Sequence, residues 1–203
     1  MTEPIELTLM RHARSRADDE NVHEGRYDSP LTEAGRAQVH KRAEYFIAEG
    51  YKPDTIIASS LVRARETAEI LAQALKVSLE TDSDWMEFNN GPLAGLSRTE
   101  ASTRYPQPGF RNPYEPYHGS GESEMELHSR VGRALERVLR RGAGTYLIVG
   151  HGGSLNAALR VALSIPYPVN KTGVWFKFGD TGFARLSYYS ERHRWIIKEL
   201  KAE

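Results

Sequence analysis

The chain has 203 residues, with 27 basic and 27 acidic side chains and no cysteine. This length suits one domain with a substantial core, and the balanced charge gives no general attraction to nucleic acid or to an acidic membrane surface. The lack of cysteine excludes disulfide bonds, thiol catalysis and thiolate metal sites. We find no signal peptide and no run of about 20 apolar residues that would span a bilayer, so we expect a cytoplasmic protein.

The first predicted element is a strand over residues 5–10, a short apolar run that ends abruptly in Arg11 and His12. The polar stretch 14–30 has no sustained periodicity, and we predict a loop there. Thr32 is a typical helix N-cap, and apolar residues at helical spacing follow it until a glycine and a proline end the helix.

A buried strand over residues 55–58 leads directly into a second amphipathic helix, and a short strand over 77–80 follows. The pattern fails between residues 92 and 121, where five prolines are interleaved with aromatic residues. A long irregular excursion in a compact domain is typical of a lid or binding loop, and the aromatic residues argue against disorder. We therefore predict a lid over about 92–121, with a helical turn near Ser97.

The last part of the chain returns to regular periodicity. Strands that alternate with helices predict a mostly parallel sheet with helices on both faces. We therefore expect an α/β fold, a three-layer α/β/α sandwich that forms one domain over residues 1–203. The predicted elements here are a helix over 122–141, a strand over 145–149, a helix over 154–163, and strands over 174–178, 183–188 and 195–200.

Two histidines follow buried strands that lie far apart in the sequence. His12 follows the first strand, and His151 lies in the run Gly-His-Gly-Gly after the strand over 145–149. In open α/β sheets a ligand binds beyond the carboxyl ends of the strands. We therefore expect both imidazoles at one mouth, with His12 facing solvent and not in the core. Each histidine alone could equally belong to an ordinary polar turn.

Two further side chains complete a candidate site. Arg63 opens the helix after the second strand, and phosphate binds well at helix N-termini flanked by arginine. The alternative is a solvated arginine paired with Glu66 one turn on. Glu87 lies in an irregular segment and could be a simple loop carboxylate. The combination of both histidines, Arg11, Arg63 and Glu87 nevertheless favours phosphoryl transfer without a metal.

Each residue type has a role in that chemistry. A phosphate monoester carries about two negative charges, and arginine and histidine donors stabilise the charge that spreads over its equatorial oxygens. A neutral imidazole can attack phosphorus to form a phosphohistidine, provided that a hydrogen bond fixes its other nitrogen. A carboxyl group can protonate the leaving alkoxide and then take a proton from water. No carboxylate cluster suggests a magnesium site, so we expect neither a metal nor another cofactor.

With these motifs, the sequence resembles the phosphatase branch of the histidine phosphatase superfamily over nearly the whole chain. The fold of that family is phosphoglycerate-mutase-like, and its signature is Arg-His-Gly. The resemblance implies that His12 is the phosphorylated nucleophile and that Arg11 and Arg63 bind the phosphate. It also implies that Glu87 is the acid/base and that His151 is a second catalytic histidine that binds phosphate. Further similar segments are residues 27–35, Ser59, Arg63-Ala64, Glu66-Thr67-Ala68, Gly91 and Gly121-Glu122-Ser123.

The sequence departs from the family's pattern near the signature. The signature glycine is Ala13, which fits if its φ is negative, and the usual acidic residue after it is Arg14. The phosphate-contacting asparagine of the family falls at Asp18, whose charge would repel the substrate. Asn21 could replace it only if the loop shifts, so we assign that role to neither residue.

Three functions fit these residues. We favour a phosphatase in which water attacks the phosphohistidine. The first alternative is a cofactor-dependent phosphoglycerate mutase, but such mutases carry a longer insertion and a Glu-Arg-His-Tyr-Gly run where this chain has Glu-Phe-Asn-Asn-Gly over 87–91. The second is a non-catalytic module that binds a phosphate ligand or a protein.

The sequence leaves the substrate undetermined beyond a small phosphorylated metabolite. We expect no nucleic-acid or membrane partner, and a homodimer remains open. Seven basic side chains could approach the mouth of the site, and we expect most of them to be solvated: Arg14, Arg16, Arg26, Arg98, Arg104, Arg111 and His118.

Overall fold

The computed structural model describes residues 3–170 and 172–202. Within this part of the chain six strands form one sheet, which is parallel across four strands and is extended by an antiparallel hairpin. The expected mostly parallel sheet is therefore confirmed. In spatial order the strands are β3 (Ser78–Thr81), β2 (Thr55–Ala58), β4 (Gly144–Gly150), β1 (Ile5–Arg11), β5 (Phe183–Tyr189) and β6 (Arg194–Lys201).

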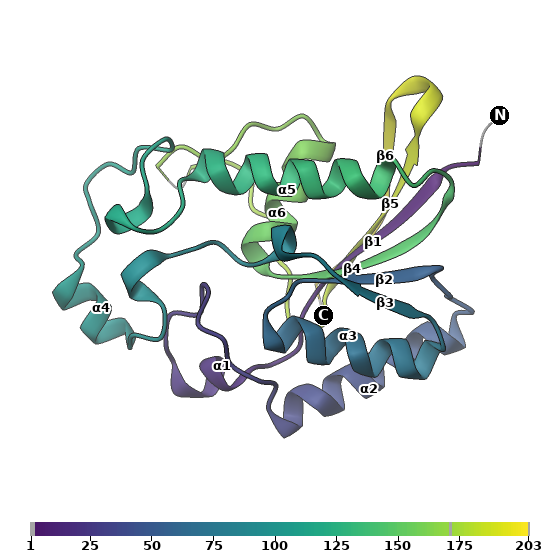
Figure 1. Cartoon of the computed structure of the whole chain (residues 1–203), viewed down its shortest axis with the longest axis horizontal. Coiled ribbons are helices and arrows are strands. Elements are labelled where there is room, and N and C mark those ends of the chain that lie inside the picture. The colour runs from purple at the N-terminus through teal and green to yellow at the C-terminus, as the bar shows by residue number, and fades with distance from the viewer. Residues whose placement is uncertain (1–2, 171, 203) are drawn as a thin grey trace.

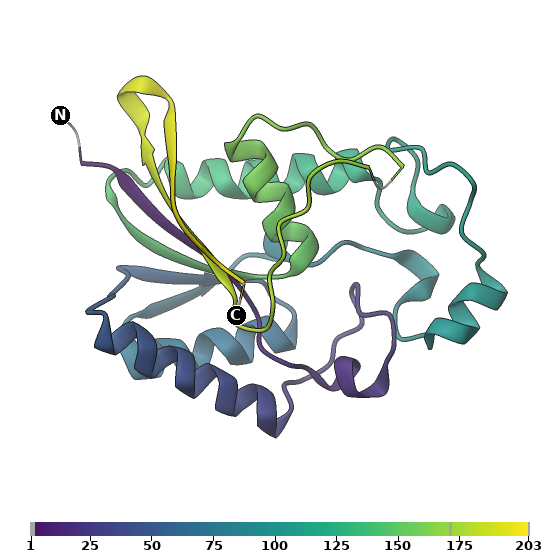
Figure 2. The same cartoon turned by 180° about the vertical axis from the view of Figure 1, so that it is seen from behind.

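Helices cover both faces of the sheet, which confirms the three-layer α/β/α architecture (Figures 1 and 2). Helices α2 (Glu33–Ala48) and α3 (Val62–Leu75) pack together on one face, and α5 (Glu124–Leu139) and α6 (Gly152–Ala162) pack together on the other. Two short helices, α1 (Arg16–Glu20) and α4 (Arg98–Arg104), lie in the connections beyond the sheet.

The side chains of each central strand alternate between two cores, as the pleat requires. On β1, Leu7 and Leu9 join the core beneath α5 and α6, whereas Met10 joins the core beneath α2 and α3. On β4, Ile148 lies in the first core and Leu147 in the second. Because both faces are covered, these strands are continuous apolar runs in the sequence.

The helix starts follow capping chemistry. Thr32 caps α2 as predicted, because its hydroxyl accepts a hydrogen bond from the Gly35 amide over 3.0 Å. Ser123 caps α5 in a capping box with Glu126. These side chains satisfy amide groups that have no partner inside the helix, and they fix where the chain enters each outer layer.

Two predictions of local structure are wrong. The stretch 14–30, predicted to be a loop, contains the single-turn helix α1. Residues 174–178, predicted to be a strand, are irregular. The reason is that the Asn156 side chain on α6 both donates to and accepts from the Phe176 backbone, at 2.9 and 2.8 Å. A side chain thus satisfies backbone groups that a neighbouring strand would otherwise pair.

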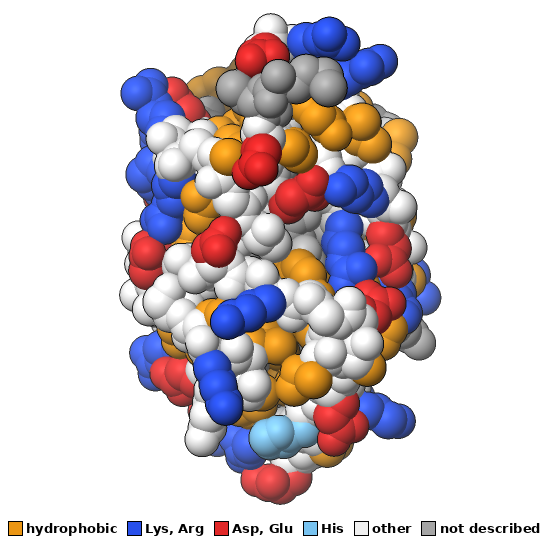
Figure 3. All heavy atoms as spheres, turned by 90° about the vertical axis from the view of Figure 1, so that its right-hand side faces the viewer, with side chains coloured by type: hydrophobic (Ala, Val, Ile, Leu, Met, Phe, Trp, Pro, Cys, Tyr) orange, Lys and Arg blue, Asp and Glu red, His pale blue; other side chains and the backbone are white. Residues whose placement is uncertain are grey.

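The fold brings the carboxyl ends of β1, β2 and β4 to one edge of the sheet, because these strands are parallel neighbours. On the opposite side, at the right of Figure 1, the acidic and basic side chains of the described residues are interspersed over the surface (Figure 3). None of the helices in the described residues has the length and apolar character required to cross a membrane.

Candidate active site

The two predicted histidines lie side by side at the carboxyl edge of the sheet. Arg11, the last residue of β1, is in register with Gly150, the last residue of β4, and each is followed by a histidine. The ring centroids of His12 and His151 are 4.9 Å apart. Both side chains are fully buried, so the expectation that His12 faces solvent is wrong: the side chains of Arg63 and Glu24 lie against its ring.

The His12 ring is held in one tautomer. Its Nδ1 is 2.8 Å from the Ala13 carbonyl oxygen, and because a carbonyl only accepts, Nδ1 carries the proton. The lone pair is therefore on Nε2, where it accepts a hydrogen bond from Arg63 Nε over 3.2 Å. Burial, and then the charges of Arg63 and Arg11, hold the His12 pKa well below its ordinary value. The ring is therefore neutral, as a nucleophilic imidazole must be.

His151 presents a free nitrogen. Its Nε2 is 2.8 Å from the Ser59 hydroxyl, and its buried Nδ1 has no hydrogen-bond partner within the described residues. Burial, followed by the charge of Arg63, lowers the His151 pKa well below its ordinary value. A Ser59 hydroxyl that donates to Nε2 leaves the proton of the neutral ring on Nδ1. In that tautomer Nδ1 is a hydrogen-bond donor.

Arg63 is fixed by its surroundings and is not solvated. Its side chain is fully buried, and Nη1 and Nη2 donate to the carbonyl oxygens of Tyr27 and Gly25, each over 2.9 Å. The alternative pairing with Glu66 does not occur, because Glu66 pairs with Arg36 at 3.1 Å. Arg63 is therefore a rigid cation beside the His12 ring.

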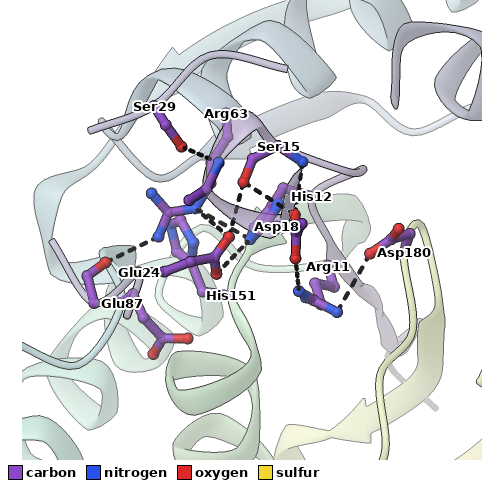
Figure 4. Close-up of polar contacts among 12 residues, drawn as sticks. Arg11, His12, Ser15, Asp18, Glu24, Ser29, Arg63, Glu87, His151 and Asp180 are labelled. Atoms are coloured by element: carbon purple, nitrogen blue, oxygen red, sulfur yellow. Dashed lines mark hydrogen bonds and ion pairs between the residues drawn. The ribbon is translucent and has the colours of Figure 1, made fainter. Parts of the chain in front are cut away.

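Arg11 lies between two carboxylates, as Figure 4 shows. It pairs with Asp180 at 3.3 Å and with Asp18 at 3.9 Å. Asp18 in turn caps α1 by accepting from the Ser15 amide over 2.7 Å and from the Ser15 hydroxyl over 3.0 Å. The position that aligns with the family's asparagine thus serves a local turn and a neighbouring arginine.

Asn21 lies outside the site. It ends α1 in a left-handed conformation with φ of 52°, and its side chain accepts from Arg98 on the exposed surface. Ala13 is buried and has no positive φ, so the alanine fits at the signature glycine position. Arg14 pairs with Asp19 at the surface. Ala13 therefore fits without backbone strain, and the Arg14 side chain is directed to a surface partner.

Glu87 approaches the start of α6. Its Oε2 accepts from the Gly153 amide over 3.0 Å, and its Oε1 accepts from the Phe88 amide over 2.6 Å. A β-carbon at residue 153 would collide with the Glu87 carboxylate, so this close approach requires a glycine. The Glu87 side chain is thereby fixed at the N-terminus of α6.

Arg130, which the sequence reasoning missed, holds the segment that carries Glu87. This buried side chain on α5 donates to the carbonyl oxygens of Asp84 and Met86, each over 2.8 Å, and to that of Glu87 over 2.9 Å. It also binds both carboxylate oxygens of Glu122, at 2.6 and 2.9 Å. The only sequence signal was the similarity of residues 121–123 to the family, which pointed to Glu122 without its partner.

A cavity of about 560 Å³ opens beside these residues. Arg11, Glu24 and Glu87 are among the residues that line it. Of the seven basic side chains singled out in the sequence, Arg111 lines this cavity. Arg16, Arg98 and Arg104 are exposed, but the other four are partly buried, so the expectation that most of them are solvated is wrong. The lining residues that the sequence did not indicate include Arg160, Trp175 and Lys177.

The described residues contain no group of three or more histidine, cysteine, aspartate or glutamate side chains placed to hold a metal ion. Two cationic side chains, Arg11 and Arg63, lie with the two neutral histidines at this edge of the sheet. Such a set can bind a phosphoryl group and place it against a neutral imidazole.

The chain is similar to known proteins in sequence and in fold. The probable phosphoglycerate mutase GpmB of Yersinia pestis (strain Pestoides F) is 33% identical over 172 residues, which are 80% of this chain and 76% of that protein. A mycobacterial glucosyl-3-phosphoglycerate phosphatase in complex with VO3 superposes with a TM-score of 0.80 at 24% identity and covers 98% of this chain and 99% of its own.

A putative alpha-ribazole-5'-P phosphatase from Escherichia coli str. K-12 substr. MG1655 superposes with a TM-score of 0.83 at 18% identity and covers 97% of this chain and 96% of its own. These likenesses in structure support the fold. The family model of the histidine phosphatase superfamily (branch 1) matches residues 7–201, a span that includes both histidines, both arginines and Glu87. The chain belongs to the histidine phosphatase superfamily, branch 1.

Proposed function

We propose that this protein is a metal-independent phosphomonoesterase that acts on a small phosphorylated metabolite through a phosphohistidine at His12. The observation that carries the proposal is the fixed, neutral His12 ring, whose lone pair on Nε2 lies beside Arg63. A phosphoryl group that replaces the Arg63–His12 hydrogen bond would meet the nucleophile and the cation together. The superfamily's phosphatase and mutase-like members support phosphoryl transfer in general.

The reaction then has two steps. In the first, His12 Nε2 forms a bond to phosphorus while the ester P–O bond breaks, and Glu87 gives its proton to the leaving oxygen. In the second, Glu87 takes a proton from water, the water oxygen bonds to phosphorus, and the N–P bond breaks. Arg11, Arg63 and His151 hold the phosphoryl oxygens throughout.

The excursion over 92–121 supports a role in substrate choice. Its two ends meet, because the Glu122 amide donates to the Asn89 carbonyl over 2.9 Å. Between these ends the segment contains α4 and carries Arg111 to the cavity. We therefore propose that the excursion is a lid of the single domain, and that it contacts the part of the substrate beyond its phosphate.

The second candidate is mutase-type phosphoryl transfer, which the name of the Yersinia relative favours. One experiment separates the two: the protein is incubated in chelator with nitrophenyl phosphate and, separately, with 3-phosphoglycerate. We expect phosphate release from nitrophenyl phosphate at the same rate in chelator as in plain buffer. Isomerisation of 3-phosphoglycerate without net phosphate release would establish the mutase, and loss of all activity in chelator that magnesium restores would overturn the mechanism.

A further inference from the structure

Glu24 lies in front of the predicted nucleophile. Its Oε2 is 3.9 Å from His12 Nε2, and its Oε1 is 3.9 Å from Arg63 Nε (Figure 4). The Ser15 hydroxyl lies 2.8 Å from Oε1 and 3.0 Å from an Asp18 carboxylate oxygen, so its single proton is shared between the two carboxylates. The side chain is 20% exposed, on the wall of the cavity. Glu24 thus separates the buried imidazole from the cavity through which a substrate would enter.

The carboxylate takes up the space that a phosphoryl group needs. For attack, phosphorus must come within about 3–3.5 Å of the nucleophilic nitrogen, and its oxygens extend further toward Arg63. The Glu24 oxygens lie in that same region, at 3.9 Å from each of the two groups. Two anions cannot share the position, because the atoms overlap and the charges repel each other.

A second carboxylate, that of Asp18, lies near the predicted phosphate site. Asp18 faces Arg11 at 3.9 Å and shares Ser15 with Glu24. Both ends of the predicted phosphate site therefore have a carboxylate partner from the segment that contains α1. A phosphate must exchange these contacts for its own.

We infer that Glu24 is a specificity-determining residue: its carboxylate occupies the phosphoryl subsite of the unliganded protein, competes with phosphate for Arg63 and His12, and must be displaced for a phosphate ester to bind. The inference rests on the proposed function of this site. On this inference, the Glu24 side chain lowers the affinity of the site for a phosphate dianion.

The backbone around Glu24 indicates how the displacement occurs. The His23 amide donates to the Leu96 carbonyl, and the Gly95 amide donates to the His23 carbonyl, each over 2.9 Å. On the other side, the Gly25 carbonyl accepts from Arg63 over 2.9 Å. Because the chain is tied on both sides, the side chain rotates out of the subsite while its backbone stays in place.

Binding of inorganic phosphate tests the inference without any turnover. Phosphate is titrated calorimetrically at pH 7 into the wild type, into Glu24→Gln and into the control Glu20→Gln. Gln at position 24 keeps the size of the side chain and an acceptor for Ser15 but removes the charge. Glu20 lies in the same segment and pairs with Arg16 at 3.0 Å on the surface, so its variant removes an equal charge away from the site.

We expect Glu24→Gln to bind phosphate at least about tenfold more tightly than the wild type, because a like charge within about 4–6 Å shifts such an equilibrium by one to three powers of ten. The Glu20→Gln variant should stay within about twofold of the wild type. Thermal unfolding of all three proteins shows whether each variant is folded. A Glu24→Ala variant, which also lacks the charge, should likewise bind phosphate more tightly than the wild type.

The possible failures are distinguishable. Equal affinities of the wild type and Glu24→Gln would overturn the inference and leave the proposed function standing. Weaker binding by Glu24→Gln would also overturn it, since Glu24 would then assist phosphate instead of competing with it. If none of the proteins binds phosphate, the proposed function of the site fails as well.

Discussion

Arg63 Nε donates a hydrogen bond to His12 Nε2 over 3.2 Å, so the predicted phosphate-binding cation and the predicted nucleophile are direct partners. Two consequences follow. In the proposed mechanism, this bond is exchanged for one to a phosphoryl oxygen when substrate binds. Until then burial, and after it the charge of Arg63, hold the His12 pKa well below its ordinary value. The lowered pKa of His12 also makes the free energy of unfolding depend on pH.

The stability should depend on pH through the two buried histidines. Burial and neighbouring cations lower the pKa of both His12 and His151 well below the ordinary value of 6.5. Below about pH 6.5 the unfolded chain therefore binds protons that the folded chain does not, so the free energy of unfolding falls as the pH decreases. Each histidine contributes at most about 1.4 kcal/mol per pH unit.

Denaturant unfolding between pH 7 and pH 5 measures this slope. The His12→Gln variant should show a shallower slope than the wild type, because one buried imidazole no longer titrates. His40 is an exposed histidine on α2, and His40→Gln should leave the slope unchanged. Parallel slopes for the wild type and His12→Gln would show that the pKa of His12 is the same in the folded and unfolded chains.

Glu87→Gln tests the proton donor. An alkyl phosphate expels a strongly basic alkoxide, so the loss of general acid catalysis should reduce its turnover by about 10²–10⁴-fold. A nitrophenyl phosphate expels a stabilised phenolate, and its initial phosphorylation burst should survive. The glutamine retains an acceptor for the Gly153 amide. Equal losses for both esters would mean that Glu87 positions the phosphate and that the acid is elsewhere.

Arg130→Lys tests whether Arg130 is a positioning residue for Glu87. Lysine keeps the charge but cannot reach the three carbonyl groups and Glu122 together. We expect a loss of kcat that is larger for alkyl than for nitrophenyl esters, with KM nearly unchanged, and a loss of about 1–3 kcal/mol in unfolding free energy from unsatisfied acceptors.

Arg137→Lys is the matched control, because Arg137 lies on the same helix and pairs at the surface with Asp82 and Asp84. This variant should leave the ratio of kcat for alkyl and nitrophenyl esters unchanged. Its free energy of unfolding should stay within about 0.5 kcal/mol of the wild type. If Arg130→Lys slowed both esters equally, the arginine would support the fold of the segment without placing the Glu87 carboxylate.

The sequence predicted those features of the site that depend on short segments of the chain. The apolar runs before His12 and His151 were sufficient to place both rings at one edge, because parallel neighbours end together. Arg130 and Glu24 could not be assigned in this way, since their partners lie far away in the chain or in an irregular loop. The prediction of a strand over residues 174–178 failed for a related reason. Their apolar character is typical of a strand, but the Asn156 side chain, and not a neighbouring strand, pairs with the Phe176 backbone.

Arg111 should influence substrate choice. It lies over the rings of Tyr117 and Phe88, 4.2 and 4.7 Å from their centroids, and lines the cavity. Arg111→Ala should change the ranking of a panel of phosphate esters by about 1–2 kcal/mol in relative kcat/KM, with little effect on nitrophenyl phosphate. Arg104, exposed on α4, supplies the control variant. An unchanged ranking in Arg111→Ala would make the excursion a structural cover alone.

The most direct test of the central claim is the site of covalent phosphate. Wild-type protein is quenched in alkali during turnover of a phosphate ester, digested and mapped by mass spectrometry, with His12→Ala alongside. We predict acid-labile phosphate on His12 in the wild type, and in the His12→Ala variant neither label nor turnover. Label on His151 would reverse the roles of the two histidines, and label on a serine, or full turnover by His12→Ala, would contradict the account.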